Sequence, residues 1–227
     1  GLCFKEAAKA SLKQKEITLI GIEPTYPATG FGYIERNGEV EDLEGVFQVK
    51  SFKEKPNFQT ARRYMSNGNY LWNCGYFVGS VNTFLNAMDE YAPELRENYE
   101  KLKDTRSLEQ YRDRYLSFEN EVIDIALIEK SKSLLVVPAG FDWMDVGSFK
   151  DLHDANESDE QNNFLLGDNI HSIEVENAFV RNEEPNKHVA LIGLDNIVVI
   201  NTKDGLLVAR KDLSHRVGEI AKKIQQQ

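Results

Sequence analysis

The pattern of apolar residues changes near Asn156, and no other feature of the sequence constrains the fold as strongly. Before this point, short apolar runs alternate with segments of helical periodicity, which is typical of an α/β domain. After it, short runs of strand-forming residues follow one another at near-regular intervals, with turn residues between them. We therefore expect two domains: an α/β domain over residues 1–155 and a β-rich module over residues 156–227.

The α/β part is expected to contain both helices and strands. A helix over 4–13 precedes a strand over 17–22, and Asn37-Gly38 predicts a hairpin turn between strands over 30–35 and 46–53. The remaining expected elements are helices over 60–66, 81–91 and 121–130, a helix from Pro93, and strands over 76–78 and 134–138.

The β-rich part is expected to end in a helix. Strand spacing alone does not choose among a small sandwich, a barrel and turns of a β-helix. The final helix begins at Ser214 and places Val217, Ile220, Ala221 and Ile224 on one face, so we expect it to pack against another element. The expected strands span 170–175, 178–181, 188–192, 197–201 and 206–209.

Charge argues against nucleic acid as a partner. The sequence has 27 Lys and Arg against 37 Asp and Glu, a net charge of −10, and its cations are scattered in short clusters such as Arg62-Arg63. Such a surface repels a phosphodiester backbone. At 227 residues the chain is nevertheless long enough to bury a sizeable core.

Cysteine usage and the lack of long apolar runs indicate the compartment. Only Cys3 and Cys74 occur, so neither a disulfide framework nor a zinc site can be built from cysteines. No apolar run approaches the roughly 18 residues of a membrane span, and the start of the sequence does not resemble a secretory signal. We expect a soluble, cytoplasmic protein with no membrane contact.

Glu54-Lys55-Pro56 lies at the end of the expected strand 46–53. Proline favours an extended conformation in the residue before it, so we expect Lys55 to be extended there. Lys55 suits a phosphate, and Glu54 suits sugar hydroxyls. Neighbouring strand residues point to opposite faces, so both can serve one ligand only if the strand ends or bulges at this point. The alternative is a surface ion pair.

Two glycine-containing segments are further candidates. Asn73 offers two donors and an acceptor, and Gly75 allows a ligand to approach the backbone. A turn between a helix and a strand would explain these two residues equally well. Gly30 and Gly32, just before a strand, are also compatible with no more than a tight turn.

Asp142 and Asp145 follow the strand over 134–138. Two carboxylates so spaced suit Mg²⁺, which is typically held by one or two carboxylates together with waters and substrate phosphates. The alternative is that Asp145 or Ser148 caps the helix that follows.

Five motifs occur together in the order and approximate spacing of the sugar-1-phosphate nucleotidylyltransferases, and the chain resembles that family. Its tail, residues 189–224, is similar to the C-terminal module of the mannose-1-phosphate guanylyltransferases, or GDP-mannose pyrophosphorylases. The resemblance implies a partial α/β nucleotidyltransferase domain, Rossmann-like with a mixed sheet, followed by a small β-helix-like module. The motifs are TYPATGFGYIE (25–35), FKEKP (52–56), YLWNCGYF (70–77), VIDIALIEK (122–130) and FDWMDVGSF (141–149).

The resemblance also implies an activity and its residues. The reaction converts GTP and mannose 1-phosphate into GDP-mannose and pyrophosphate, with Mg²⁺ as cofactor. Lys55 and Asp145 would be catalytic, and Asp145 would bind the metal, whereas Asp142 is not carried over. The implied substrate-binding residues are Gly32, Tyr33, Glu54, Lys55, Asn73 and Gly75.

One family feature is not found in this sequence: the glycine-rich signature that cradles the nucleotide triphosphate. A second metal-binding aspartate is not found either. We therefore expect a fragment that is inactive alone, and one whose exposed sheet edges lead to a homo-oligomer. Two alternatives stay open: a non-catalytic sugar-nucleotide-binding or regulatory subunit, and a nucleotidylyltransferase for another hexose 1-phosphate.

Overall fold

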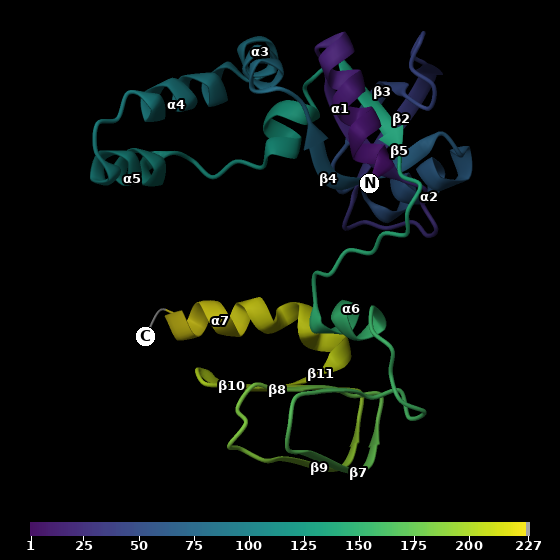
Figure 1. Cartoon of the computed structure of the whole chain (residues 1–227), viewed down its shortest axis with the longest axis vertical. Helices are drawn as coiled ribbons and strands as arrows, with labels where there is room; N and C mark the ends of the chain where they lie inside the picture. The colour runs from purple at the N-terminus through teal and green to yellow at the C-terminus, as the bar shows by residue number, and fades with distance from the viewer. Residues whose placement is uncertain (226–227) are drawn as a thin grey trace. The chain divides into compact units, whose positions relative to one another are not determined.

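The computed structural model describes residues 1–225, which fall into two compact units, Gly1–Asp142 and a second that begins at Trp143 (Figure 1). The positions of the two units relative to one another are not determined, and each is described by itself. The expected domain limits, 1–155 and 156–227, are not tested by these two compact units and stay predictions.

The strands of the first unit form a mixed sheet that closes on itself in the order β1-β4-β2-β3-β5. β1 and β5 are parallel, and the other neighbouring strands are antiparallel. Because β5 pairs with both β1 and β3, every strand of this sheet has a neighbouring strand on both sides. The free edges behind the expected self-association are therefore not found here, and the homo-oligomer stays a prediction. The strands are β1 (Ile17–Ile22), β2 (Gly32–Glu39), β3 (Phe47–Lys53), β4 (Tyr70–Val78) and β5 (Leu134–Pro138).

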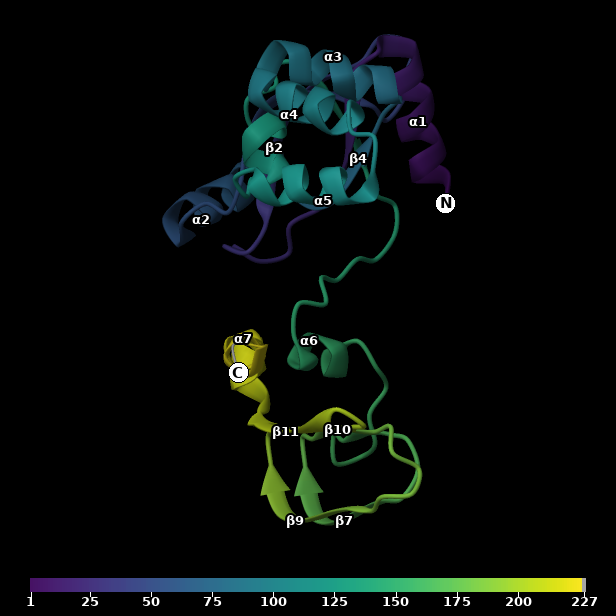
Figure 2. The ribbon, with the colours of Figure 1, turned by 90° about the vertical axis from the view of Figure 1, so that its left-hand side faces the viewer.

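Side-chain caps mark where several helices of the first unit begin. Asn57 accepts a hydrogen bond from the Thr60 N–H at 2.9 Å, and Ser80 accepts one from the Thr83 N–H at 3.1 Å. α5, which lies near α4 in Figure 2, was not expected from the sequence. Neither α4 nor α5 contains a buried residue. None of the helices within residues 1–225 is both long and apolar enough to cross a membrane. The helices are α1 (Leu2–Gln14), α2 (Phe58–Asn67), α3 (Val81–Tyr91), α4 (Pro93–Lys103) and α5 (Leu108–Ser117), followed by a π-helical turn (Asp124–Ile128).

The expected hairpin turn at Asn37-Gly38 is wrong. Both residues lie within β2, and the chain reverses after them, where the Val40 N–H donates to the Val46 carbonyl at 2.8 Å. A tight Asn-Gly turn needs positive φ at both positions. Neither Asn37 nor Gly38 has a positive φ, because the longer loop that follows makes the reversal.

Two other elements of the first unit differ from expectation. The strand expected over 76–78 begins at Tyr70, and its buried residues are 71–73. The helix expected over 121–130 is only a π-helical turn, closed by the Glu129 N–H bonding to the Asp124 carbonyl at 2.7 Å. Three consecutive residues of this turn, 126–128, are buried, whereas an α-helix on a core buries every third or fourth residue.

The second unit is a small β-helix. β6, β8 and β10 pair in parallel, β11 joins β10 antiparallel, and β7 pairs with β9 in a separate parallel sheet. The five expected strands are confirmed, and β6 is additional. The strands are β6 (Phe164–Leu166), β7 (Ile170–Glu176), β8 (Phe179–Asn182), β9 (Val189–Asp195), β10 (Ile197–Thr202) and β11 (Gly205–Arg210).

Asparagines stack at one corner of this β-helix. Asn162, Asn177 and Asn196 all have φ between 54 and 58°, a region that asparagine tolerates better than most residues. The Asn162 Nδ2 donates to Asn177 Oδ1 at 2.8 Å. The Asn177 Nδ2 donates to Asn196 Oδ1, and the Asn196 Nδ2 to Asp212 Oδ1, both at 3.3 Å. We call these four residues the asparagine ladder.

The helices of the second unit are α6 (Phe149–Asp154) and α7 (Val217–Gln225), with a 3-10 turn (Lys211–Arg216) before α7. α7 contains no fully buried residue, so the expected packing of the final helix stays a prediction. Ile220 and Ile224 are 52% and 65% exposed. The apolar face exists, and within the second unit these two side chains stay exposed.

A buried histidine and a buried lysine link α6 to the asparagine ladder. His153 Nε2 donates to the Asn162 carbonyl at 3.0 Å, which leaves Nδ1 to accept from Lys211 Nζ at 2.8 Å. Lys211 Nζ also donates to Asn177 Oδ1. Burial, and then the positive charge of Lys211, lower the pKa of His153.

We expect the second unit to lose stability as the pH falls below about 6.5, the ordinary pKa of histidine. Because the pKa of His153 is lowered in the folded state, the unfolded chain binds more protons there, so stability is present above that pH and lost below it. Hydrogen exchange of second-unit peptides in urea between about pH 5 and 7.5 measures this. His153→Gln should flatten the pH dependence, and an unchanged slope in that variant would contradict the assignment.

Candidate functional site

Three strands of the first unit bring the expected sugar-phosphate residues together. Gly32 begins β2 and pairs with Asn73 in β4, while Tyr33 pairs with the last residue of β3, just before Glu54. A Cβ on Gly32 would lie 2.6 Å from Glu54 Oε2 and 3.2 Å from Asn73 Cβ. Glu54 and Asn73 therefore flank Gly32, and only a glycine leaves room for both.

The two carboxylate oxygens of Glu54 have different surroundings. Its side chain is only 10% exposed, and its Oε1 lies 3.2 Å from Lys55 Nζ. Its Oε2 is buried and has no hydrogen-bond partner among the residues that the structure describes. A buried acceptor left unpaired costs free energy, so this oxygen is suited to receive a ligand's hydroxyl.

Lys55 does not have the extended backbone that Pro56 predicted. Its φ is +42°, a conformation unfavourable for residues other than glycine. β3 ends at Lys53, so the alternation of side chains stops there and Glu54 and Lys55 can form their ion pair. The alternative of an ion pair is thus correct, but only Lys55 is exposed, at 61%, and its ammonium is accessible to a ligand.

Asn73 is buried within β4, so the alternative that placed it in a turn is wrong. Its Oδ1 accepts from the Gly75 N–H at 3.1 Å, and its Nδ2 donates to Asp124 Oδ1 at 2.8 Å. One Nδ2 hydrogen remains for a ligand. Gly75 has a φ of +77°, which favours glycine, and the space beside it is open.

Tyr33 lies beneath this cluster. Its side chain is fully buried, and its hydroxyl donates to the Ala28 carbonyl at 3.0 Å. Any contact with a ligand would have to come from its backbone. Trp72, also buried, packs edge-on against Tyr26 and Phe31 with ring centroids 4.9 and 5.2 Å apart, which fixes the loop that leads into Gly32.

Sequence reasoning missed two acids at this site, Asp124 and Glu129. Asp124 holds the amide of Asn73, and Glu129 pairs with Lys53 at 2.6 Å through Oε1. The hydrogen bond to Glu129 raises the pKa of Lys53. Both acids lie within the motif 122–130. Periodicity placed that motif on an α-helix and gave no sign that these two side chains share a face.

Asp145 lies in the second unit, apart from this cluster in the sequence. Ser148, not Asp145, caps α6, by accepting from the Asp151 N–H at 3.2 Å. A Cβ on Gly147 would lie 3.5 Å from Asp145 Oδ2 and 3.9 Å from Asp151 Oδ2, so both carboxylates approach the same point. Among residues 1–225, no three or more His, Cys, Asp or Glu side chains are grouped to hold a metal.

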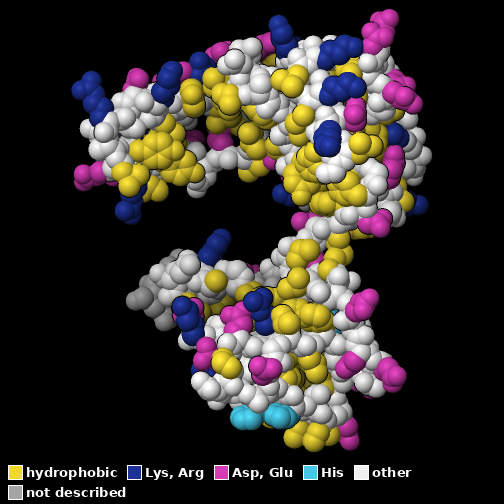
Figure 3. Space-filling view, viewed as in Figure 1, with side chains coloured by type: hydrophobic (Ala, Val, Ile, Leu, Met, Phe, Trp, Pro, Cys, Tyr) yellow, Lys and Arg dark blue, Asp and Glu magenta, His cyan; other side chains and the backbone are white. Residues whose placement is uncertain are grey.

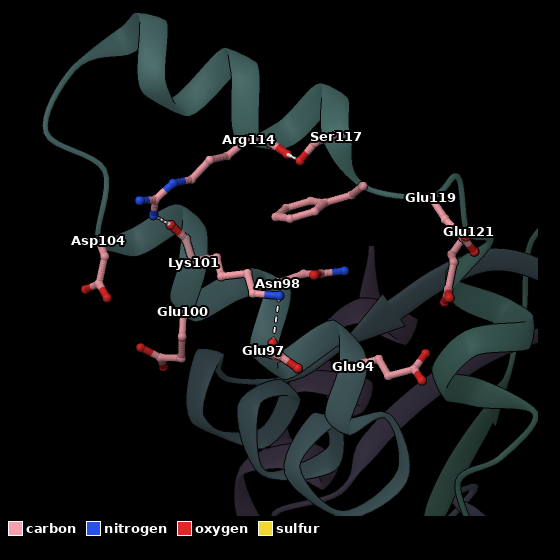
Figure 4. Close-up of a pocket in the computed structure, with 11 residues that line it drawn as sticks. Glu94, Glu97, Asn98, Glu100, Lys101, Asp104, Arg114, Ser117, Glu119 and Glu121 are labelled. Carbon is pink, nitrogen blue, oxygen red and sulfur yellow. Dashed lines mark hydrogen bonds and ion pairs between the residues drawn. The ribbon is translucent and has the colours of Figure 1, made fainter.

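A large hollow of the first unit lies elsewhere, between α4 and α5 (Figure 4). It encloses about 880 Å³, and most of the charged side chains around it are acidic. Such a lining repels a sugar phosphate. Beyond it, α5 exposes a cluster of large apolar side chains, visible in Figure 3. They are Leu108, Tyr111, Tyr115 and Leu116.

Comparison with known proteins identifies both parts of the chain. Residues 3–162 match the family model described as nucleotidyl transferase. The chain belongs to the nucleotidyl transferase family. Residues 168–224 of this nucleotidyl transferase match the model of the MannoseP isomerase/GMP-like beta-helix domain. The expected fold class, an α/β nucleotidyltransferase domain followed by a β-helix-like module, is confirmed.

Named relatives point the same way. Xanthan biosynthesis protein XanB of Xanthomonas campestris is 32% identical over 222 residues, covering 96% of this chain and 46% of that protein. A mannose-1-phosphate guanylyltransferase of Escherichia coli is 34% identical over 208 residues, covering 88% of this chain and 44% of the relative. The nucleotidyl transferase described here thus spans about half the length of the curated relatives it matches. The resemblance to mannose-1-phosphate guanylyltransferases is confirmed.

Solved structures include a mannose-1-phosphate geranyltransferase from Thermus thermophilus, with a TM-score of 0.80 and 27% identity. The match covers 99% of this nucleotidyl transferase and 64% of that chain. A mannose-6-phosphate isomerase from Helicobacter pylori matches over 63% of this chain and 58% of that one, with a TM-score of 0.53 and 25% identity.

Proposed function

We propose that the first unit binds mannose 1-phosphate and that the chain takes part in the transfer of a guanylyl group from GTP to this sugar phosphate. In this reaction a phosphate oxygen of mannose 1-phosphate attacks the α-phosphorus of GTP. The bond from that phosphorus to the bridging oxygen of the β-phosphate breaks, and pyrophosphate leaves with the electron pair. GDP-mannose is the product. The name of the Escherichia coli relative supports this assignment.

The observation that carries the proposal is the buried, unpaired Oε2 of Glu54 beside Gly32. A sugar hydroxyl lying over Gly32 can donate to this oxygen and satisfy it. The remaining Nδ2 hydrogen of Asn73, on the other flank of Gly32, can donate to a second sugar oxygen. The pair forms a site for a polyhydroxyl ligand rather than for an apolar one.

Lys55 supplies the charge for the phosphate. Its exposed ammonium sits next to the buried Glu54 carboxylate, so one ligand can present hydroxyls to Glu54 and a phosphate to Lys55. Phosphoryl-type transfers need little covalent help from the protein, and positioning and charge stabilisation dominate them. Gly75, with open space beside it, allows the ligand to approach the β4 backbone.

Asp145 is the proposed metal residue, and a carboxylate is a ligand that suits Mg²⁺. It does not cap α6, and Asp151 offers a second carboxylate near the same point. Mg²⁺ typically binds one or two carboxylates and takes its other ligands from water and substrate phosphates. Nucleotidyl transferases generally use such a divalent metal, which when bound neutralises charge on the phosphates.

Lys55→Ala should weaken mannose 1-phosphate binding at least about tenfold, because a charged hydrogen bond contributes roughly 1.5–3 kcal/mol. Isothermal titration calorimetry of the 227-residue chain measures this. Lys50→Ala is the matched control, since Lys50 is an exposed lysine of β3 that pairs with Glu35 and should leave the affinity unchanged. Equal affinities for wild type and Lys55→Ala would contradict the proposal.

Titrations with other ligands, together with an assay of pyrophosphate release, separate this function from the two alternatives. GDP-mannose binding without pyrophosphate release from GTP would favour a sugar-nucleotide-binding or regulatory subunit. Tighter binding of glucose 1-phosphate than of mannose 1-phosphate would favour another hexose. Pyrophosphate release that Asp145→Ala abolishes would show that this chain catalyses the transfer itself.

A further inference from the structure

The π-helical turn and the residue after it contact Asn73 and Glu54, one on each side of Gly32. Its first residue, Asp124, accepts the Asn73 Nδ2 hydrogen bond at 2.8 Å. Glu129, which closes the turn, pairs with Lys53 at 2.6 Å and receives the Glu54 N–H at 3.4 Å. Asn73 and Glu54 are the two residues that flank Gly32.

The π geometry explains how two acids five residues apart can act together. In an α-helix, five residues advance the direction of a side chain by about 140° beyond a full turn, which would send one of the two acids away from the strands. The wider π turn, with its i to i+5 hydrogen bond, brings such residues close to the same face. The Glu129 N–H to Asp124 carbonyl bond, at 2.7 Å, is this bond.

The turn is also anchored. Leu127 and Ile128 are buried in the same core cluster as Phe52 and Leu71, and Ala126 is buried as well. Phe52 lies in β3 and Leu71 in β4, so the core ties the turn to both strands. π turns are rare and frequently occur at functional sites.

We propose that Asp124 and Glu129 are positioning residues that hold Asn73 and Glu54 in the orientation a sugar phosphate requires. This inference rests on the proposed function for the identity of the ligand. Asp124 directs one hydrogen of the Asn73 amide to itself and so fixes where the other hydrogen points. Glu129 fixes the backbone at the end of β3, and with it the carboxylate of Glu54.

Substitutions at Asp124 test the first half of this pair. Asp124→Leu removes the acceptor at similar size and should weaken mannose 1-phosphate binding about tenfold. Asp124→Asn keeps an acceptor oxygen and should stay within about threefold of wild type. Glu121→Gln, a change at an exposed acid three residues earlier, is the control and should leave binding unchanged. If Asp124→Leu binds as tightly as wild type, the inference is overturned.

A second comparison separates positioning from general support of the fold. If Asp124 acts through Asn73, then Asp124→Leu should change affinity less than about twofold in an Asn73→Ala background, because the two effects are not additive. An equal loss in both backgrounds would mean that Asp124 only supports the fold, and would overturn the positioning role.

A measurement without ligand keeps this inference separate from the proposed function. In ¹⁵N-labelled chain, the side-chain amide of Asn73 should exchange slowly in wild type and at least about tenfold faster in Asp124→Leu. Glu129→Leu should do the same to the Glu54 backbone amide. If wild type binds no mannose 1-phosphate, the proposed function fails, and these exchange rates still decide the positioning roles. Unchanged rates would overturn them.

Discussion

Gly167→Ala should unfold most of the second unit. Gly167 has a φ of +107°, and a Cβ there would lie 2.1 Å from the Asn182 carbonyl oxygen and 3.0 Å from its carbon. These are backbone atoms of β8, so they cannot swing aside as a side chain could. Backbone strain and overpacking each cost about 1–3 kcal/mol, and together they approach the whole stability of a small unit.

Hydrogen exchange of peptides from residues 143–225 is the measurement, because it reports the second unit independently of the first. Gly205→Ala is the matched control, since Gly205 begins β11 of the same β-helix and has nothing within 4 Å of its Cβ position. Protection in Gly167→Ala equal to that in Gly205→Ala would show that β8 can move, contrary to expectation.

Gly32→Ala should abolish measurable mannose 1-phosphate binding while leaving the first unit folded. The added methyl would lie 2.6 Å from Glu54 Oε2, 3.0 Å from Phe52 Cζ and 3.2 Å from Asn73 Cβ. The flexible Glu54 side chain can move away, which moderates the loss of stability to about 1–3 kcal/mol. The Glu54 side chain would then leave the position in which it contacts the sugar, and the added methyl group would occupy the space between Glu54 and Asn73.

Gly30→Ala controls for this change two residues away, because nothing lies within 4 Å of its Cβ position. Calorimetry with mannose 1-phosphate and thermal unfolding of both variants separate binding from stability. A Gly32→Ala chain that binds like Gly30→Ala would show that the ligand does not lie between Glu54 and Asn73.

Patterns local to a few residues predicted much of the fold. The apolar run 17–22 is β1, and the helix expected over 60–66 with its Asn67-Gly68 stop is α2, which ends at Asn67 and is capped by Gly68 with a φ of +77°. In these cases propensity, capping and burial agree. The strands after residue 169 were likewise found from turn residues and alternation, although the sandwich, barrel and β-helix could not be told apart until parallel pairing showed which strands are neighbours.

Features that depend on tertiary contacts could not be predicted. Asn37-Gly38 carries a hairpin signal, but the chain extends β2 through it because pairing with β3 continues to Glu39. Lys55 has a positive φ although Pro56 favours an extended neighbour. Asp124 joins the site only because a π turn replaces the expected α-helix. The candidate site residues were found from residue chemistry and from a resemblance, but the acids that orient them were not found.

The asparagine ladder has a consequence for how such a chain can vary over evolution. Successive rungs are 15, 19 and 16 residues apart, so the coils between them already differ in length. The rungs fix one corner of each coil, and the opposite loops absorb the difference. Homologues should therefore accumulate insertions and deletions in segments such as 183–187, whereas a single inserted residue next to a rung would shift the hydrogen bonds of every later coil.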